Sequence, residues 1–248
     1  MTSHPGPRLA VIQHEDDCPL GLFDGWLRGA GAQVTVVRPY RGDPLPSADG
    51  FDQLDGLIVL GGSMSATDDD RCPWLPGTRG LLRAAVGGGV PALGVCLGHQ
   101  LLTVACAGRV APNPAGKQMG VVPVGYTASA TGERLFGQSA GQGGVGAIQW
   151  NNDIAVDLPA DATLLAATPD GVPQVIRVGE AAWGVQFHPE ADEHIVAAWA
   201  RSEGPVTPVE HDAIAAIAAA AADLTAAWRP VATRFATVAA ERRTTAQT

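Results

Sequence analysis

Cys96 has the sequence surroundings of a reactive thiol. It follows the apolar run Ala92–Val95 and precedes a helical apolar stripe that begins near Gln100, so a buried strand is expected to turn directly into a helix at the cysteine. Gly94 and Gly98 flank it at the spacing of a nucleophile elbow, whose tight turn leaves no room for side chains at those positions. A helix N-terminus favours a thiolate. The alternative is a structural core cysteine, which is what most free cysteines are.

A histidine and a carboxylate stand close together in the segment Phe187-His188-Pro189-Glu190. Pro189 fixes the chain after His188, so that Glu190 can return to the imidazole and orient it as a base. On its own, His-Pro-Glu is more often a surface turn. His99 is the rival base because of its closeness to Cys96, but from the first turn of a helix it would have to point backwards.

The elements around these residues predict an α/β fold. We expect a doubly wound, flavodoxin-like, mostly parallel sheet with helices on both faces, because apolar runs alternate with helical stripes. Ligands bind such sheets at the carboxyl ends of the strands, which is where Cys96 and His188 would meet. The predicted strands are 8–13, 33–37, 56–60, 92–95, 163–167, 174–178 and 184–187, and the predicted helices that precede the elbow are 19–30 and 77–86.

Two segments resemble the signatures of one enzyme family. Gly94–Leu102 (GVCLGHQLL) is similar to the nucleophile elbow of the class I, or triad, glutamine amidotransferases, and Gly184–Glu190 (GVQFHPE) is similar to their second signature. The chain resembles a stand-alone member, comparable to the glutaminase domain of GMP synthase. The resemblance implies that Cys96 is the nucleophile, His188 the base and Glu190 its orienting partner.

The resemblance also assigns an oxyanion hole and a substrate pocket. Gly62, in a double-glycine loop, and Leu97, directly after the nucleophile, would supply the oxyanion-hole N–H groups; without the resemblance, the Gly-Gly pair would favour a plain turn. His99 is assigned to packing or to the pocket wall. No metal and no organic cofactor are implied. The residues expected to bind the substrate are Gln100, Trp150, Asn152 and Asp153.

Four residues in three segments depart from the family pattern. Ser63 stands where the family loop usually has proline, and Gln118 stands where it usually has glutamate. Trp150-Asn151-Asn152-Asp153 replaces a common Trp-His-Gly-Asp segment, so Asn152 would restrict the loop if that position needs a positive φ. We therefore regard an altered substrate preference as open.

Composition limits the class of protein. The chain has 248 residues, 46% of them hydrophobic, and a net charge of −9, which argues against a nucleic-acid partner. We expect a cytoplasmic protein without a membrane span, because neither a leader pattern nor a long apolar segment is present. Its four cysteines lack metal-binding spacing and are expected to be reduced thiols.

The chain is expected to contain one catalytic domain and an extension. The class I amidotransferase domain would cover residues 1–204, and a helical extension over 205–248 would pack on it. The extension starts with a capping box at Thr207 and Glu210 and carries a helical stripe that Pro230 should end or kink. This stripe could serve packing, a synthase partner or a second copy of the chain, and the oligomeric state is open.

Three functions remain after the sequence is read. The favoured one is a glutaminase that hydrolyses the glutamine side-chain amide through a Cys96 thioester and supplies ammonia to a partner synthase. The second is a stand-alone hydrolase of γ-glutamyl amines or peptides, whose altered Asn151-Asn152 loop admits a larger leaving group. The third is a catalytically idle binding or regulatory subunit, which the intact set of Cys96, His188 and Glu190 disfavours.

Overall fold

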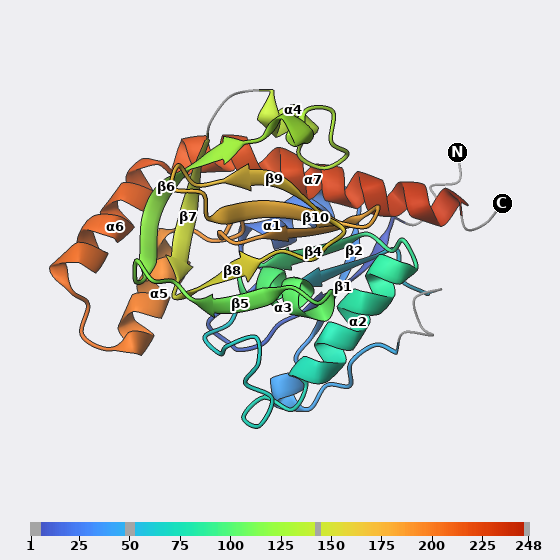
Figure 1. Cartoon of the computed structure of the whole chain (residues 1–248), viewed down its shortest axis with the longest axis horizontal. Coiled ribbons are helices and arrows are strands. Elements are labelled where there is room, and N and C mark those ends of the chain that lie inside the picture. Colours follow the sequence, from blue (N-terminus) through green and yellow to red (C-terminus); the bar gives the residue numbers. More distant parts are fainter. Residues whose placement is uncertain (1–5, 48–52, 142–144, 246–248) are drawn as a thin grey trace.

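A nine-stranded mixed sheet forms the centre of the chain (Figure 1). The computed structural model describes residues 6–47, 53–141 and 145–245. Along the sheet the strands are β2 (Gln33–Val37), β1 (Arg8–Ile12), β3 (Gly56–Val59), β4 (Ala92–Val95), β11 (Ala182–Val185), β10 (Pro173–Val178), β9 (Ala162–Ala167), β6 (Gln118–Tyr126) and β7 (Val145–Asn151). A separate two-stranded sheet pairs β5 (Arg109–Pro112) with β8 (Asp153–Asp157).

The predicted fold class is confirmed. Strands β2, β1, β3, β4, β11, β9 and β7 run in one direction, whereas β10 and β6 run the opposite way. The half of the sheet from β2 to β11 is entirely parallel, and its central strands β3, β4 and β11 are completely buried, as expected for a sheet that is covered on both faces.

Helices cover the two faces of the sheet and create two cores. The main helices are α1 (Leu22–Gly29), α2 (Leu75–Gly87), α3 (Leu97–Ala105), α5 (Glu193–Glu203), α6 (Pro208–Ala219) and α7 (Ala221–Thr245), with short turns α4 (Gly137–Ala140), η1 (Pro39–Arg41) and η3 (Ala128–Ala130). Side chains of α1, α5, α6 and α7 share one buried cluster with Leu9 and Val11 of β1. Those of α2 and α3 share the other with Ala10 and Ile12. Alternate residues of one strand thus enter opposite cores.

Four loops meet at one edge of the parallel half. Because β1, β3, β4 and β11 are mutually parallel neighbours, the residues after their carboxyl ends lie together. These are His14 and Glu15 after β1, Gly61 to Ser63 after β3, Cys96 after β4, and Gln186 to His188 after β11. The sheet topology therefore assembles the candidate site from segments far apart in the sequence.

The C-terminal helices differ from the prediction at Pro230. The helix does not end at Pro230: α7 runs through this residue, so that half of the prediction is wrong, and a kink there stays a prediction. The chain bends by 68° at the junction of α6 and α7. Proline removes one backbone donor, but Trp228, Val231 and Phe235 on both sides of it are buried in the core, so tertiary packing maintains the helix. The capping box at Thr207 and Glu210 is present as predicted.

Helices α6 and α7 pack on the sheet and on α1 rather than standing apart (Figure 1). The division into residues 1–204 and 205–248 stays a prediction, and its outermost residues, 1–5 and 246–248, lie outside the described part. Within the described residues, no single helix is long and apolar enough to cross a membrane, and only the bent pair α6–α7 meets the length and composition criteria jointly.

Candidate active site

Cys96 lies at the turn between β4 and α3 in a backbone conformation that is rare for a side-chain-bearing residue. Its φ is 49° and its ψ −103°, and it caps the N-terminus of α3. A Cβ on Gly94 would lie 2.3 Å from the Gly98 carbonyl oxygen, and one on Gly98 would lie 2.0 Å from the Val59 carbonyl oxygen. Both positions therefore require glycine. The Cys96 N–H donates to Val185 O at 2.8 Å, which ties the turn to β11.

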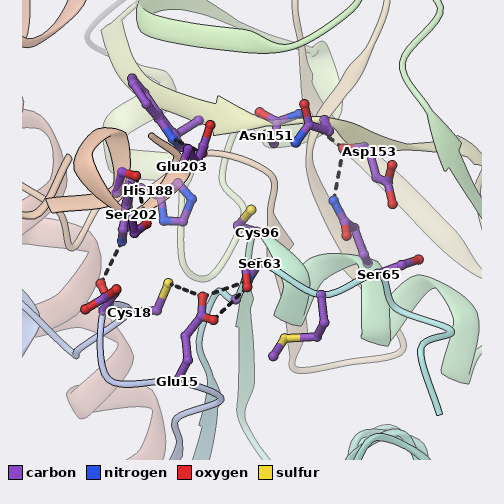
Figure 2. Close-up of a pocket in the computed structure, with 17 residues that line it drawn as sticks. Glu15, Cys18, Ser63, Ser65, Cys96, Asn151, Asp153, His188, Ser202 and Glu203 are labelled. Carbon is purple, nitrogen blue, oxygen red and sulfur yellow. Dashed lines mark hydrogen bonds between the residues drawn. The ribbon is translucent and has the colours of Figure 1, made fainter. Parts of the chain in front are cut away.

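His188 stands between the thiol and a buried carboxylate. Its Nδ1 lies 2.8 Å from Glu190 Oε1, with side-chain exposures of only 3% and 4%. Its ring also lies beside the Cys96 thiol (Figure 2). Because Nδ1 faces Glu190, Nε2 is the nitrogen left for Cys96. Burial alone lowers the pKa of His188, but the negative charges of Cys96 and Glu190 outweigh it and raise the pKa above the usual histidine range.

The neighbouring elements hold this pair in place. The backbone N–H of His188 donates to Ile148 O at 2.8 Å, and its ring centroid lies 4.5 Å from that of Trp199 on α5. Helix α1 begins at Leu22 rather than at the predicted residue 19, because Gly21 has a φ of 55°. Leu22 N–H donates to Glu190 O at 2.8 Å, so the start of α1 fixes the backbone of the carboxylate residue.

The loop after β3 passes next to both reactive side chains. A Cβ on Gly61 would lie 2.9 Å from His188 Cε1 and 3.7 Å from Cys96 Cβ, and one on Gly62 would lie 2.9 Å from Leu97 Cδ2. Only glycine allows the backbone to approach this closely. Gly62 and Leu97, the two residues predicted to stabilise an oxyanion, thus lie in contact at the first turn of α3.

A cavity of about 680 Å³ opens over the thiol (Figure 2). Cys96 and His188 lie next to each other in its lining (Figure 2). Glu190 is not part of the lining and contacts His188 from outside it. Every predicted site residue except Glu190 and Leu97 lines the cavity directly, so the structure brings the whole predicted set together. The lining residues are Glu15, Asp17, Cys18, Gly62, Ser63, Met64, Ser65, Cys96, Gln100, Trp150, Asn151, Asn152, Asp153, His188, Trp199, Ser202 and Glu203.

Amide side chains form the inner wall. Gln100 Nε2 donates to the Asp153 carbonyl at 3.0 Å and to Gln186 Oε1 at 3.4 Å, and Gln186 Nε2 in turn lies 3.7 Å from Cys96 Sγ. Asn151 Nδ2 also donates to Asp153 O, at 3.1 Å, and to Gln118 Oε1, at 3.4 Å. Among described residues other than glycine, only Cys96 and Ala107 have a positive φ. Asn152 therefore occupies its loop position without the restriction considered from the sequence.

Trp150 is held as a wall of the cavity by charged neighbours. Its Nε1 donates to Glu203 Oε1 at 2.9 Å, and Lys117 Nζ lies 4.1 Å from its ring centroid while pairing with the same Glu203. Lys117 also lies 3.9 Å from Glu210, at the start of α6. Helix α6 thereby contacts this wall of the cavity through Lys117, a link for which the sequence gives no signal.

Several lining residues were missed by the sequence analysis. Glu15 follows β1, and its loop had a usable signal, because the carboxyl end of a strand beside β3 must face the same edge as Cys96. Trp199 and Glu203 come from α5, and nothing in their spacing indicates that this helix turns toward the pocket. Gln186 does not line the cavity but contacts Gln100 and Cys96 from behind it, and although it lies inside the second signature it had no assigned role.

His99 and the other titratable groups near Cys96 do not form a second reactive set. His99 does not line the cavity: it is completely buried against Gly184, and burial lowers its pKa to about 4, in agreement with the packing alternative. All four cysteines are free. Within the described residues, no group of three or more His, Cys, Asp or Glu side chains could hold a metal ion.

Comparison with known sequences identifies the family. The model of the family "Glutamine amidotransferase class-I" matches residues 26–195. The glutamine amidotransferase-like protein YfeJ of Salmonella typhimurium is 30% identical over 186 residues, which cover 74% of this chain and 75% of that protein. Gamma-glutamyl peptidase 5 of Arabidopsis thaliana is 26% identical and covers 67% and 65%. The pyridoxal 5'-phosphate synthase subunit PdxT of Leifsonia xyli is 30% identical and covers 74% and 88%.

Solved structures share the fold over nearly the whole chain. A glutamine amidotransferase from Thermotoga maritima superposes with a TM-score of 0.80 at 21% identity, covering 94% of this chain and 99% of that one. A GMP synthase subunit from Thermoplasma acidophilum gives a TM-score of 0.66 at 19% identity, covering 99% and 100%. With the elbow, the buried histidine and the family match taken together, the chain belongs to the class I glutamine amidotransferases.

Proposed function

We propose that the protein is a thiol-dependent amidase that hydrolyses the side-chain amide of glutamine to glutamate and ammonia. The observation that carries the proposal is the arrangement of Cys96, His188 and Glu190: a thiol at a helix N-terminus lies beside a buried imidazole, whose Nδ1 lies 2.8 Å from a buried carboxylate. This is the geometry of an activated nucleophile, its base and an orienting group.

The chemistry follows from these three residues. Cys96 gives its proton to His188, and the thiolate attacks the γ-carbonyl carbon of the substrate. The N–H groups of Gly62 and Leu97 stabilise the negative oxygen of the tetrahedral intermediate. When the C–N bond breaks, His188 returns the proton to the departing ammonia, and Glu190 stabilises the imidazolium until then. Water, deprotonated by His188, then cleaves the γ-glutamyl thioester to glutamate and restores the thiol.

A partner synthase is the proposed destination of the ammonia. Relatives named as a carbamoyl phosphate synthase small chain and as a pyridoxal 5'-phosphate synthase subunit support this use of the family. In the described part of the chain, only Val156 and Val209 are large hydrophobic side chains exposed by more than a third. The described surface thus offers few strongly exposed apolar side chains, and we expect any synthase to dock mainly through polar contacts.

A second candidate is a stand-alone hydrolase of γ-glutamyl amines or peptides. The cavity of about 680 Å³ has the size of a site for a drug-sized molecule and is larger than a single amino acid requires. Relatives named as γ-glutamyl peptidases and as a γ-glutamyl-L-1-hydroxyisopropylamide hydrolase match over similar lengths. Apart from His188, the charged residues of the lining are all acidic, so we expect neutral or cationic leaving groups to fit better than acidic ones.

The testing experiment compares glutamine with matched γ-glutamyl amides. Release of glutamate is measured from glutamine and from γ-glutamyl derivatives of a neutral, a cationic and an acidic amine of equal chain length, with wild type and Cys96→Ser. Highest kcat/KM for glutamine supports the glutaminase, and a preference for an amine derivative supports the hydrolase. Absence of turnover on every substrate, with no labelling of Cys96 by a glutamine-like alkylator, would refute both activities for this chain.

A further inference from the structure

The loop that contains Gly62 has few backbone hydrogen bonds to hold it in position. Leu60 N–H donates to Ile12 O at 3.0 Å, but for residues 61–64 no backbone-to-backbone hydrogen bond occurs within the described chain. The same loop passes within contact distance of His188 and Leu97. Since the donors of an oxyanion hole must be placed to within a fraction of an ångström, this loop requires an anchor from elsewhere.

Glu15 supplies two short hydrogen bonds to the loop. Ser63 N–H donates to Glu15 Oε1 at 2.7 Å, and Ser63 Oγ donates to Glu15 Oε2 at 2.7 Å (Figure 2). Both oxygens of the carboxylate are thereby engaged, and hydrogen bonds to an ionised acceptor are about twice as strong as neutral ones. The pair spans 48 positions of sequence and joins the loops that follow β1 and β3.

Glu15 is itself held by its surroundings. Cys18 Sγ donates to Glu15 Oε1 at 3.3 Å, and Gln13 Nε2 donates to the Glu15 backbone carbonyl at 2.8 Å. Gln13 is buried directly after β1, so the anchor is connected to the core of the sheet. The chain of contacts therefore runs from β1 through Gln13 and Glu15 to Ser63, the residue next to Gly62.

We infer that Glu15 is a positioning residue: by binding Ser63 it fixes the Gly61–Ser63 loop so that the Gly62 N–H faces the oxygen of the reacting carbonyl. The inference rests on the proposed amidase function. It also gives Ser63 a role that a proline at this position could not fulfil, because proline has neither the N–H nor the hydroxyl that Glu15 accepts. Glu15 acts through the loop, not on the substrate.

A double-mutant cycle tests this mechanism. We expect Glu15→Ala to lower kcat about 10- to 100-fold, less than the roughly 100- to 1,000-fold loss typical when an oxyanion donor is removed, with KM changed no more than about threefold. Ser63→Ala keeps the N–H bond and should lose less. Ser63→Pro removes both donors, so adding Glu15→Ala to it should cost no more than about a further twofold. Asp16→Asn is the matched control, because its carboxylate faces Tyr40 and Arg41.

Hydrogen exchange gives a readout that is independent of turnover. In Glu15→Ala, the amides of residues 61–64 should exchange faster, whereas those of α3 should not change. The inference is overturned if exchange or kcat is unaltered in Glu15→Ala. It is also overturned if the losses of kcat from Glu15→Ala and Ser63→Pro multiply in the double variant. Multiplying losses together with a raised KM would mean that Glu15 acts on the substrate directly. An inactive wild type would instead refute the proposed function, and the inference would fall with it.

Discussion

Replacing Glu190 with glutamine removes a charge next to His188 while keeping the shape of the side chain. The two groups are 2.8 Å apart and almost completely buried, so solvent screens their interaction very little. A hydrogen bond to a charged group contributes about 1.5–3 kcal/mol. The reactive form is the thiolate–imidazolium pair, so losing that contribution makes this form harder to reach and lowers kcat by about 10- to 160-fold, at roughly tenfold per 1.36 kcal/mol.

The sign of the accompanying pH effect follows from the same contact. Glu190 is one of the charges that raise the pKa of His188, so Glu190→Gln should lower that pKa. The alkaline limb of the kcat/KM profile, where the imidazolium loses its proton, should therefore move to lower pH. The wild-type profile, measured on the preferred substrate over the same pH range, is the reference.

Glu193→Gln is the matched control for this substitution. Glu193 lies at the start of α5, where its carboxylate lies 3.6 Å from His194 rather than from His188. It undergoes the same change from acid to amide and should retain wild-type kcat and pH profile. Thermal unfolding of both variants separates a local effect from misfolding. A folded Glu190→Gln protein with a kcat within about twofold of wild type and an unmoved alkaline limb would refute the assignment of Glu190 as the orienting group.

Three further predictions concern stability and are measured by urea unfolding. Gly98→Ala places a Cβ 2.0 Å from Val59 O and should lower the free energy of unfolding by about 1–3 kcal/mol. Gly80→Ala, inside α2 with nothing within 4 Å of the added Cβ, is the control and should raise it by up to about 1 kcal/mol. Equal effects of the two substitutions would contradict the packing argument. Burial lowers the pKa of His14 to about 4, so on acidification the unfolded chain binds a proton on this histidine near pH 6.5, before the folded chain does. The free energy of unfolding should therefore fall by about 2 kcal/mol from pH 7 to pH 5 because of His14. His14→Asn should remove this part of the pH dependence, and an unchanged pH dependence would exclude His14 as its source. Thr207→Ala should cost about 1 kcal/mol through loss of the α6 cap, and a neutral result would show that the cap does not stabilise the helix in this context.

The parts of the fold that sequence patterns predict are those with a local signal. The strands at β1 to β4 and the elbow at Cys96 were predicted because apolar runs and glycine spacing report directly on burial and close approach. The order of strands and the antiparallel pairing of β10 and β9 depend on contacts between distant segments, for which a single sequence gives no signal. Pro230 shows the opposite case, in which a local signal for the end of a helix is overridden by the packing of Trp228 and Phe235, and α7 continues through the proline.

The candidate site also contains residues with a local signal in the sequence and residues without one. Cys96, His188 and Glu190 belong to two short segments whose composition indicates their chemistry, and their convergence follows from the parallel pairing of β4 with β11. The contacts of Glu15 with Ser63, and of Glu203 with Trp150, join residues 48 and 53 positions apart. Each is a polar contact at the edge of the pocket, and neither leaves a periodic pattern in the sequence that could predict it.

The nucleophile and the loop that faces it are held by different means, and this difference has a consequence for specificity. Cys96 keeps a backbone conformation that costs on the order of 1–3 kcal/mol because β3, β4 and α3 are packed so closely around it that it cannot relax. A substitution that alters this packing would also disturb the buried core of the sheet. The Gly61–Ser63 loop and the Trp150 wall are held by polar side chains, Glu15 and Glu203, at the edge of the cavity. We therefore expect substitutions at Glu203 to reshape the Trp150 wall while the thiol stays in place, and substitutions at Glu15 to act on the Gly61–Ser63 loop instead.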